Sequence, residues 1–342
     1  MTRNNQHPTI GVIGAGSWGT ALAWILAHNG FPVHLWSYEK ETADQITKEK
    51  ENKVFLPGVI LPDSIVPTTQ LSEALDQKDM LVLAVPSHFF RGVLKQILPW
   101  LSLIPSDCLW ISATKGIENE SLLTMSGVLG ELLDPAYHPN IGSLSGPTFA
   151  KEVSRKLPTA VTLASREDKT AQKARSFFFN DFFRVYTNRD LLGVELGGAL
   201  KNVIALAAGM SDGLGLGHNS RAALITRGLA EICRLGEKMG AMRPTFFGLA
   251  GIGDLVLTCT GELSRNRSVG LRLGQGEKLS AILSSMTMVA EGVKTTKAAH
   301  QLAQRESVEM PIVSQVYSIL YEDCQPRAAV KGLMTRDLKA EG

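Results

Sequence analysis

The amino-acid sequence predicts an α/β protein in which an N-terminal, doubly wound sheet is followed by an all-helical C-terminal domain. Three observations predict this fold. A β-branched run at residues 9–13 ends at a glycine-rich loop, which a helical pattern and a second apolar run at 33–36 follow. Further strand-like runs alternate with helical segments up to about residue 190, where helical periodicity takes over. The 342 residues also exceed the usual size of one hydrophobic core.

The change near residue 190 divides the chain into two expected domains, 1–190 and 191–342. Further strands of the first domain are expected at 80–85, 109–112, 141–144, 160–164 and 182–186. In the second domain, helices are expected over about 191–210 and 221–239, with polar and glycine-rich breaks at 211–220 and 258–267.

Bulk composition excludes several classes of protein. With 44% hydrophobic and 20% charged residues, the chain can form packed cores and is not a disordered protein. A formal net charge of +2 is too small to indicate a nucleic-acid partner or a membrane surface. Residues 1–8 lack the apolar core of a signal peptide, and the most apolar later stretch, 203–210, is too short to span a bilayer. We therefore expect a cytoplasmic protein without membrane insertion.

The cysteines suggest neither a disulfide framework nor a metal site. They are scattered, without a C-x-x-C pair, at Cys108, Cys233, Cys259 and Cys324. Reduced cysteines that pack among apolar neighbours are expected, as in a reducing cytosol. The sequence shows no cluster with metal-ligand spacing, so no metal is expected.

The glycine-rich loop reads Gly14-Ala15-Gly16-Ser17-Trp18-Gly19. In a G-x-G-x-x-G loop the first glycine permits a tight turn, the second lets the backbone approach a pyrophosphate, and the third lets helix pack closely on strand. The motif alone is a weak signal. Here it follows a predicted strand and opens a predicted helix, so it indicates a Rossmann-type dinucleotide site with the pyrophosphate at the helix N-terminus.

The end of the second predicted strand normally indicates which dinucleotide binds. An acidic residue there binds the ribose hydroxyls of NAD, whereas an arginine accepts the 2′-phosphate of NADP. This chain has Ser37 and Tyr38, with Glu39 just beyond. Tyr38 lies either against the adenosine or on the surface as a strand-end aromatic, so the choice between NAD and NADP stays open.

Polar groups follow two further predicted strands. Lys115 comes just after residues 109–112, and Gly146 and Thr148 come just after 141–144. Ligands of doubly wound sheets bind outside the carboxyl ends of the strands, so these residues are candidates for a site. Alternatively, Lys115 is an exposed loop cation.

Lys201 stands in a helical segment where almost every neighbour is small or apolar. Such a lysine either snorkels to water or points into a cleft, where partial desolvation would make it a usable general acid or base. The adjacent Gly197 and Gly198 favour close approach. Asp254 follows two glycines in a turn-like context suited to orienting a neighbour.

The segment Ser264-Arg265-Asn266-Arg267 brings hydroxyl, guanidinium and amide donors together. This combination holds a phosphate well, because guanidinium can bind it bidentately. The alternative is a solvated basic turn.

Taken together, the sequence resembles the bacterial NAD(P)-dependent glycerol-3-phosphate dehydrogenases over essentially its whole length. Each matching stretch is short, but their order and spacing are specific. The stretches that carry the resemblance are 14–21, 85–88, 114–116, 145–150, 197–202, 251–258 and 264–267.

The resemblance implies a reversible hydride transfer that interconverts dihydroxyacetone phosphate and sn-glycerol 3-phosphate with NAD or NADP. It also implies that the sn-glycerol 3-phosphate is used for phospholipid synthesis. It implies a C-terminal domain like that of 6-phosphogluconate dehydrogenase and a homodimer. The catalytic residues it implies are Lys201 as proton donor and acceptor, with Lys115 and Asp254. The substrate contacts it implies are Lys115, Gly146, Thr148, Lys201, Asp254, Ser264, Arg265 and Asn266. The cofactor contacts it implies, beside Gly14, Gly16 and Gly19, are Ser17, Trp18, Tyr38, Lys115, Ala150, Arg265, Val289 and Glu291.

One departure bears on the cofactor. Many relatives carry a basic residue that contacts the 2′-phosphate where this chain has Tyr38, and Glu39 would favour NAD if it reached the ribose. Two other functions remain as alternatives: a reductase for a 3-hydroxy acid or ketopantoate, and a dinucleotide sensor without catalysis. Lys201 argues against the sensor, which needs no acid on that helix.

Overall fold

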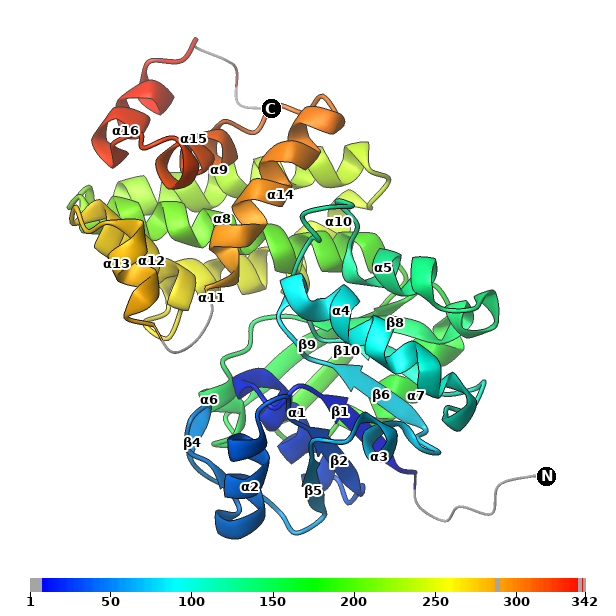
Figure 1. The fold of residues 1–342 in the computed structure, drawn as a ribbon. Coiled ribbons are helices and arrows are strands. Elements are labelled where there is room, and N and C mark those ends of the chain that lie inside the picture. Colours follow the sequence, from blue (N-terminus) through cyan, green and yellow to red (C-terminus); the bar gives the residue numbers. More distant parts are fainter. Residues whose placement is uncertain (1–7, 287–289, 338–339, 341–342) are drawn as a thin grey trace. The chain divides into compact units, whose positions relative to one another are not determined.

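The computed structural model describes residues 8–286, 290–337 and 340, which fall into two compact units (Figure 1). The first unit comprises the described parts of Met1–Lys115 and Leu123–Glu195, and the second those of Gly116–Leu122 and Leu196–Gly342. The chain therefore leaves the first unit after Lys115, contributes a short segment to the second, and returns. It crosses finally inside helix α8 (Leu191–Gly213).

The first unit is built on a sheet that has eight strands within the described residues. Its spatial order is β10-β9-β8-β7-β6-β1-β2-β5. The strands are β1 (Ile10–Ile13), β2 (Val33–Trp36), β5 (Ile65–Thr68), β6 (Met80–Leu83), β7 (Leu109–Ser112), β8 (Ile141–Ser145), β9 (Thr159–Ser165) and β10 (Phe183–Asn188). From β5 to β8 the neighbours are parallel, in the arrangement of a dinucleotide-binding sheet. β9 runs antiparallel to β8. The predicted fold class is confirmed.

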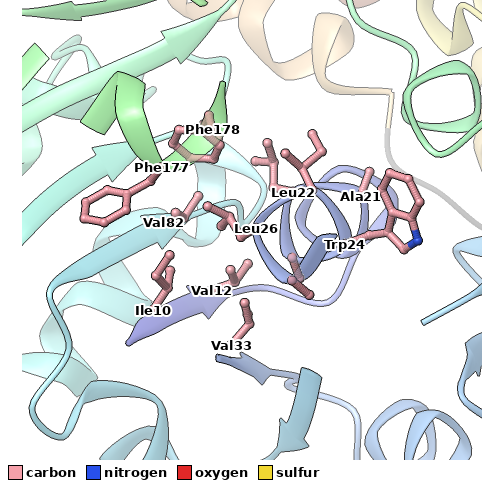
Figure 2. Packing of buried hydrophobic residues seen from close by; sticks show 14 of the residues in the cluster. Ile10, Val12, Ala21, Leu22, Trp24, Leu26, Val33, Val82, Phe177 and Phe178 are labelled. Atoms are coloured by element: carbon pink, nitrogen blue, oxygen red, sulfur yellow. The ribbon is translucent and has the colours of Figure 1, made fainter. Parts of the chain in front are cut away.

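Every residue of β1, β6, β7 and β8 is buried, because helices cover the sheet. They are α1 (Ser17–His28), α2 (Lys40–Glu49), α3 (Leu71–Leu75), α4 (Ser87–Ile97), α5 (Met125–Leu132), α6 (Ala150–Val153) and α7 (Asp168–Phe178), with 3₁₀ turns at Leu98–Leu103 and Pro135–Asn140. Figure 2 shows Leu26 of α1 beside Val12 of β1, with Phe177 and Phe178 of α7 in the same apolar cluster. This packing fixes the start of α1 at the end of β1.

Three strands of the first unit were not predicted. They are β5 and the antiparallel pair β3 (Glu51–Asn52) and β4 (Leu56–Ile60). Pro57 and Gly58 lie in β4 and Pro67 lies in β5, and such residues suggest loops rather than strands. Proline is tolerated here because β5 is at the edge of its sheet and β4 belongs to a two-stranded one.

Apart from its early segment, 116–122, which forms no helix, the second unit is all-helical in the residues that the structure describes, as predicted. Its helices are α8, α9 (Gly217–Lys238), α10 (Arg243–Phe246), α11 (Asp254–Thr260), α12 (Arg265–Gly274), α13 (Leu279–Ser284), α14 (Glu291–Arg305), α15 (Pro311–Tyr321) and α16 (Pro326–Met334), with a π-helical turn at Leu249–Gly253. The predicted breaks were too long, because α8 extends to Gly213 and α9 begins at Gly217.

Helix α8 is the apolar centre of the second unit. Residues 203–210 are part of this 23-residue helix, which is long and apolar enough to cross a membrane by composition, with mean hydropathy 1.5. The expectation that the apolar stretch is too short to span a bilayer was therefore wrong. However, 94% of its apolar window is buried inside the protein, as in a core helix.

Glycines let α12 approach α8 closely. A Cβ on Gly209 of α8 would lie 2.1 Å from the carbonyl oxygen of Arg267, and one on Gly270 of α12 would lie 2.1 Å from that of Leu206. Both distances are far below any real contact, so each helix backbone occupies the space that the other's side chains would need. The close approach holds the N-terminus of α12 beside α8.

Two buried glutamates cap helix N-termini. Glu231 of α9 accepts hydrogen bonds from the backbone N–H groups of Ile312 and Val313 in α15, at 2.7 and 3.2 Å. Burial raises its pKa to about 7. In the first unit, Glu195 accepts hydrogen bonds from the backbone N–H and the hydroxyl of Ser126 in α5, and burial raises the pKa of Glu195 above its usual range.

Candidate functional site

The three loop glycines differ in their surroundings. Gly14 has φ of +115°, which favours glycine. A Cβ on Gly19 would lie 1.9 Å from the carbonyl oxygen of Gly14, so only glycine lets α1 pack this closely on the loop. A Cβ on Gly16 would meet no atom within 4 Å. The loop is therefore tightly packed at its two ends and open at its centre.

The residues that open α1 leave polar groups beside this opening. Ser17 is the first residue of α1, and Gly16 precedes it as N-cap. The indole Nε1 of Trp18 is buried without a hydrogen-bond partner in the described structure. Free N–H groups and the helix dipole make such a helix start favourable for an anion. The open centre at Gly16 and the start of α1 fit a dinucleotide phosphate at this position.

Tyr38 follows β2 and is the exposed aromatic that the sequence allows as one alternative. Its side chain is 78% exposed and packs edge-on against Trp36, with ring centroids 6.4 Å apart. The hydroxyl of Ser37 donates to the carbonyl oxygen of Glu39 at 2.9 Å, and Glu39 is the N-cap of α2. The end of β2 thus carries no arginine and one acidic side chain beyond the strand.

Lys115, Gly146 and Thr148 come together at the carboxyl ends of β7 and β8. Nζ of Lys115 donates a hydrogen bond to the carbonyl oxygen of Gly146 at 3.3 Å, and Oγ1 of Thr148 donates to the same oxygen at 3.2 Å. Gly146 has φ of +150° and packs against Val161. A Cβ on Gly146 would lie 2.9 Å from the Cα of Val161. Ala150 begins the short helix α6 that follows. Lys115 is half-buried rather than a fully exposed loop cation.

Lys201 lies in the middle of α8 and does not snorkel to water. Its Nζ donates hydrogen bonds to Oδ1 of Asp254 and, at 2.8 Å, to Oγ1 of Thr258. The lysine is 5% exposed and Asp254 is fully buried. The hydroxyl of Thr258 donates in turn to the carbonyl oxygen of Asp254 at 2.6 Å. Asp254 and Thr258 lie one turn apart on α11, so a single helix face receives the lysine.

A glycine contact brings this face of α11 close to α8. A Cβ on Gly197 of α8 would lie 2.6 Å from the carbonyl oxygen of Ala250, in the π-helical turn before α11. Gly251 in that turn has no room for a side chain either, since a Cβ would lie 2.1 Å from the carbonyl oxygen of Phe246. Close approach is thus the reason for Gly197, as the sequence suggests.

The donors of residues 264–267 separate into two sets in the structure. Ser264 is the N-cap of α12 and accepts a hydrogen bond from the backbone N–H of Arg267. The guanidinium of Arg267 is bound to Asp212 of α8, with Nη2 at 2.7 Å from Oδ2. Arg267 therefore supports the packing of α12 on α8, and Ser264, Arg265 and Asn266 remain as the candidates for binding a ligand.

Asn266 joins three helices of the second unit. Its Nδ2 donates to Oδ1 of Asn202 in α8, and its Oδ1 accepts from the backbone N–H of Gly292 in α14, both at 2.9 Å. Gly292 has no space for a side chain, because a Cβ would lie 2.8 Å from the carbonyl oxygen of Asn202. Glu291 begins α14. Val289, the other cofactor candidate of this region, lies outside the described residues.

Metal ligands do not cluster in the described part of the chain, where no group of three or more His, Cys, Asp or Glu side chains could hold an ion. The thiol of Cys259 interacts electrostatically with Lys201 and Asp254, and its side chain is fully buried. Burial raises its pKa to about 12, so its thiol stays protonated.

Comparison with known proteins identifies the family. The family model of the NAD-dependent glycerol-3-phosphate dehydrogenase N-terminus matches residues 9–171, and that of the C-terminus matches residues 190–331. The glycerol-3-phosphate dehydrogenases [NAD(P)+] of Syntrophobacter fumaroxidans and Geobacter sulfurreducens are 55% and 56% identical over 332 residues, 97% of this chain and 97% and 98% of theirs. The chain belongs to the glycerol-3-phosphate dehydrogenase family.

The solved structures agree with this assignment. A crystal structure of glycerol-3-phosphate dehydrogenase from Coxiella burnetii is 40% identical to this chain and superimposes with a TM-score of 0.89, covering 96% of this chain and 99% of that one. The match to the glycerol-3-phosphate dehydrogenase family extends through both units, so it includes the glycine loop, Lys115, Lys201 and the start of α12.

Two residues that the sequence analysis did not select contact residues of the candidate site. Thr258 contacts Lys201, and Asn202 contacts Asn266. A signal for Thr258 was present in the sequence, because it stands four residues after Asp254 and so shares its helix face. Asn202 follows Lys201 directly, and its partner could not be inferred without the packing of α12 on α8.

Proposed function

We propose that this protein interconverts dihydroxyacetone phosphate and sn-glycerol 3-phosphate with NAD(P)H or NAD(P)+. The observation that carries the proposal is the buried Lys201 with Asp254 and Thr258, in a chain that matches this dehydrogenase family over residues 9–171 and 190–331. A bound nicotinamide supplies the hydride. The sequence alternatives, a reductase for unphosphorylated acids and a dinucleotide sensor, are outcomes of the test below.

Lys201 supplies the proton in this proposal. Hydride addition to a ketone leaves negative charge on its oxygen, and a lysine ammonium stabilises that charge and delivers the proton. Asp254 accepts one N–H of Lys201 and Thr258 accepts a second, so the two contacts fix the direction of the amino group. In the reverse direction the neutral amine removes the proton from the alcohol.

Ser264, Arg265 and Asn266 bind the substrate phosphate. The N-terminus of α12 supplies backbone N–H groups, and an arginine there adds charge-assisted hydrogen bonds. Lys115, Gly146 and Thr148 contribute further polar groups to the substrate, and Lys115 also contacts the cofactor. Holding the phosphate orients the carbonyl, so that binding energy remote from the reaction is used for positioning.

The first unit binds the dinucleotide through Gly14, Gly16, Ser17, Trp18 and Gly19, with Tyr38 at the adenosine end and Ala150 as a further contact. Arg265 and Glu291 are the proposed contacts from the second unit, together with Val289. We assign residues 1–190 mainly to cofactor binding and residues 191–342 mainly to substrate binding and catalysis, with the contacts named above as the exceptions. Both NAD and NADP are compatible with the end of β2, which carries no arginine.

The wider role follows from the reaction. The product, glycerol 3-phosphate, is the backbone of membrane phospholipids, and we propose that the enzyme supplies their synthesis in the cytoplasm. We also propose a homodimer, without membrane insertion or nucleic-acid partner.

The test is a spectrophotometric assay at about 340 nm, the nicotinamide absorbance. Purified protein mixed with dihydroxyacetone phosphate and NADH or NADPH is expected to oxidise at least one cofactor. Lys201→Met is expected to lower kcat by about 100-fold or more, the usual contribution of a general acid. Cofactor affinity should stay nearly unchanged. Folded protein that oxidises neither cofactor, or that reduces an unphosphorylated keto acid equally well, would refute the proposal.

A further inference from the structure

A buried asparagine outside the glycine motif is bonded to the phosphate loop. Asn52 ends β3 and is fully buried. Its Nδ2 donates to the carbonyl oxygen of Ala15 at 2.8 Å and to Oγ1 of Thr20 at 2.9 Å. Thr20, on the first turns of α1, also donates to the carbonyl oxygen of Ala15, at 3.2 Å. Two side chains thus converge on one carbonyl in the middle of the loop.

The direction of this carbonyl sets the direction of the next N–H. In a trans peptide the C=O of residue 15 and the N–H of residue 16 point to opposite sides. Because Asn52 and Thr20 hold the Ala15 oxygen toward the protein interior, the N–H of Gly16 is directed away from it. Gly16 is also the residue beside which a Cβ would meet no atom within 4 Å. The N–H therefore points away from the Asn52 and Thr20 contacts, at a residue that has room beside its Cα.

The other end of the Asn52 amide fixes a second contact to the loop. Its Oδ1 accepts a hydrogen bond from the backbone N–H of Phe55 at 3.1 Å. The carbonyl oxygen of Phe55 accepts the hydroxyl hydrogen of Ser17 at 2.5 Å. One amide thus ties the β3–β4 turn to the loop directly through Ala15 and indirectly through Ser17.

We propose that Asn52 is a positioning residue for the dinucleotide, which orients the Ala15–Gly16 peptide so that its N–H meets the pyrophosphate. The inference rests on the proposed dinucleotide-binding function. Only an amide fits the arrangement: it donates to Ala15 and Thr20 and accepts from Phe55 at once. A carboxylate at this position would place negative charge against the Ala15 carbonyl with no hydrogen to donate.

The test compares binding of ADP-ribose, which carries the pyrophosphate without a nicotinamide, to wild type and to Asn52→Ala by calorimetry. We expect affinity to fall about 10- to 100-fold, the range for a lost hydrogen bond to a charged group, and Asn52→Asp to fall further. The KM for the cofactor should rise, whereas kcat at saturating cofactor and the KM for dihydroxyacetone phosphate stay near wild type.

The matched control is Asn180→Ala, in the same unit. Asn180 also bridges backbone groups, accepting from the N–H groups of Phe182 and Phe183. Its Nδ2 donates to Oδ1 of Asn29 at the C-terminal end of α1, away from the glycine loop. We expect wild-type ADP-ribose affinity for this variant. Equal affinity of Asn52→Ala and wild type would overturn the inference, as would an equal loss in the control.

Two further results keep the outcomes distinct. If Asn52→Ala does not fold, Thr20→Val decides, since it removes the other donor to the Ala15 carbonyl oxygen, the Thr20 hydroxyl. That variant should bind ADP-ribose several-fold more weakly, and unchanged affinity would overturn the inference. If wild type itself binds neither ADP-ribose nor NADH, the dinucleotide function fails, which is a separate result from failure of the role of Asn52.

Discussion

The buried carboxyl of Glu231 predicts a specific dependence of stability on pH. The change to make is Glu231→Gln, which removes the titrating group at the N-terminus of α15. Burial raises the pKa of Glu231 from 4.5 to about 7 in the folded protein. At 1.36 kcal/mol for each pKa unit, this difference corresponds to about 3 kcal/mol of the free energy of unfolding.

The sign follows from which state holds the proton. Between pH 4.5 and 7 the folded protein keeps Glu231 protonated, while the unfolded chain ionises it. The stabilising contribution is therefore fully present below about pH 4.5 and is lost as the pH rises through about 7. Relative to Glu231→Gln, the wild type should lose about 3 kcal/mol, most of it between pH 5 and pH 8.

The assay is urea denaturation of both proteins at several pH values, followed by two signals. All five tryptophans, Trp18, Trp24, Trp36, Trp100 and Trp110, belong to the first unit, so their fluorescence reports on that unit alone. Helical circular dichroism reports mainly on the second. The pH-dependent difference should appear in the dichroism transition, because Glu231 and α15 both belong to the second unit.

The control is Glu195→Gln in the first unit, where burial also raises the pKa of the carboxyl. Its pH-dependent difference should appear in the fluorescence transition instead. If wild type and Glu231→Gln give parallel stability profiles from pH 5 to pH 8, the reasoning from burial is refuted.

Three more predictions follow from contacts in the second unit. Arg265→Ala should raise the KM for dihydroxyacetone phosphate about tenfold or more, and an equal effect on an unphosphorylated analogue would contradict a phosphate contact. Gly209→Ala should lower the free energy of unfolding by about 1–3 kcal/mol, because its Cβ would lie 2.1 Å from the carbonyl oxygen of Arg267. The control is Gly92→Ala in α4, which should not destabilise the protein because a Cβ there meets open space. Equal denaturation midpoints for the two variants would count against the close packing. Lys201→Met should destabilise by about 3–5 kcal/mol, since it removes the ammonium partner of the fully buried Asp254 carboxylate. Adding Asp254→Leu should restore much of that loss without restoring activity, and an additive loss in the double variant would argue against the ion pair.

The fold could be predicted from sequence wherever local pattern and burial agree. The apolar runs of β1 and β6 and the glycine loop are such cases. The sequence of β4 and β5 misled because proline and glycine indicate loops, and only the position of these strands at sheet edges makes them acceptable. The C-terminal end of α8 and the N-terminal end of α9 were misplaced. Both helices continue through glycine and polar residues, which a sequence pattern normally assigns to a loop.

For the candidate site, sequence reasoning found residues whose type is unusual for their surroundings. Lys201 in an apolar helix and Asp254 after two glycines are examples. It did not find Asn52 or the contact of Thr258 with Lys201, because the partners are distant in sequence: Lys201 is 57 residues from Thr258, and Ala15 is 37 residues from Asn52. The spacing of Thr258 from Asp254 indicates only that the two share a helix face. Such pairings depend on how helices and strands pack, which no local pattern encodes.

The early excursion of the chain limits how this protein can be divided. Residues 116–122 belong to the second unit although strands β8–β10 of the first unit come after them. Ile117 and Glu118 in this segment are 2% and 5% exposed. A fragment ending at residue 190 would carry these side chains without the unit that buries them, and would tend to aggregate or misfold. Chimeras that exchange N-terminal halves to alter cofactor choice should therefore keep 116–122 from the parent that provides the C-terminal helices.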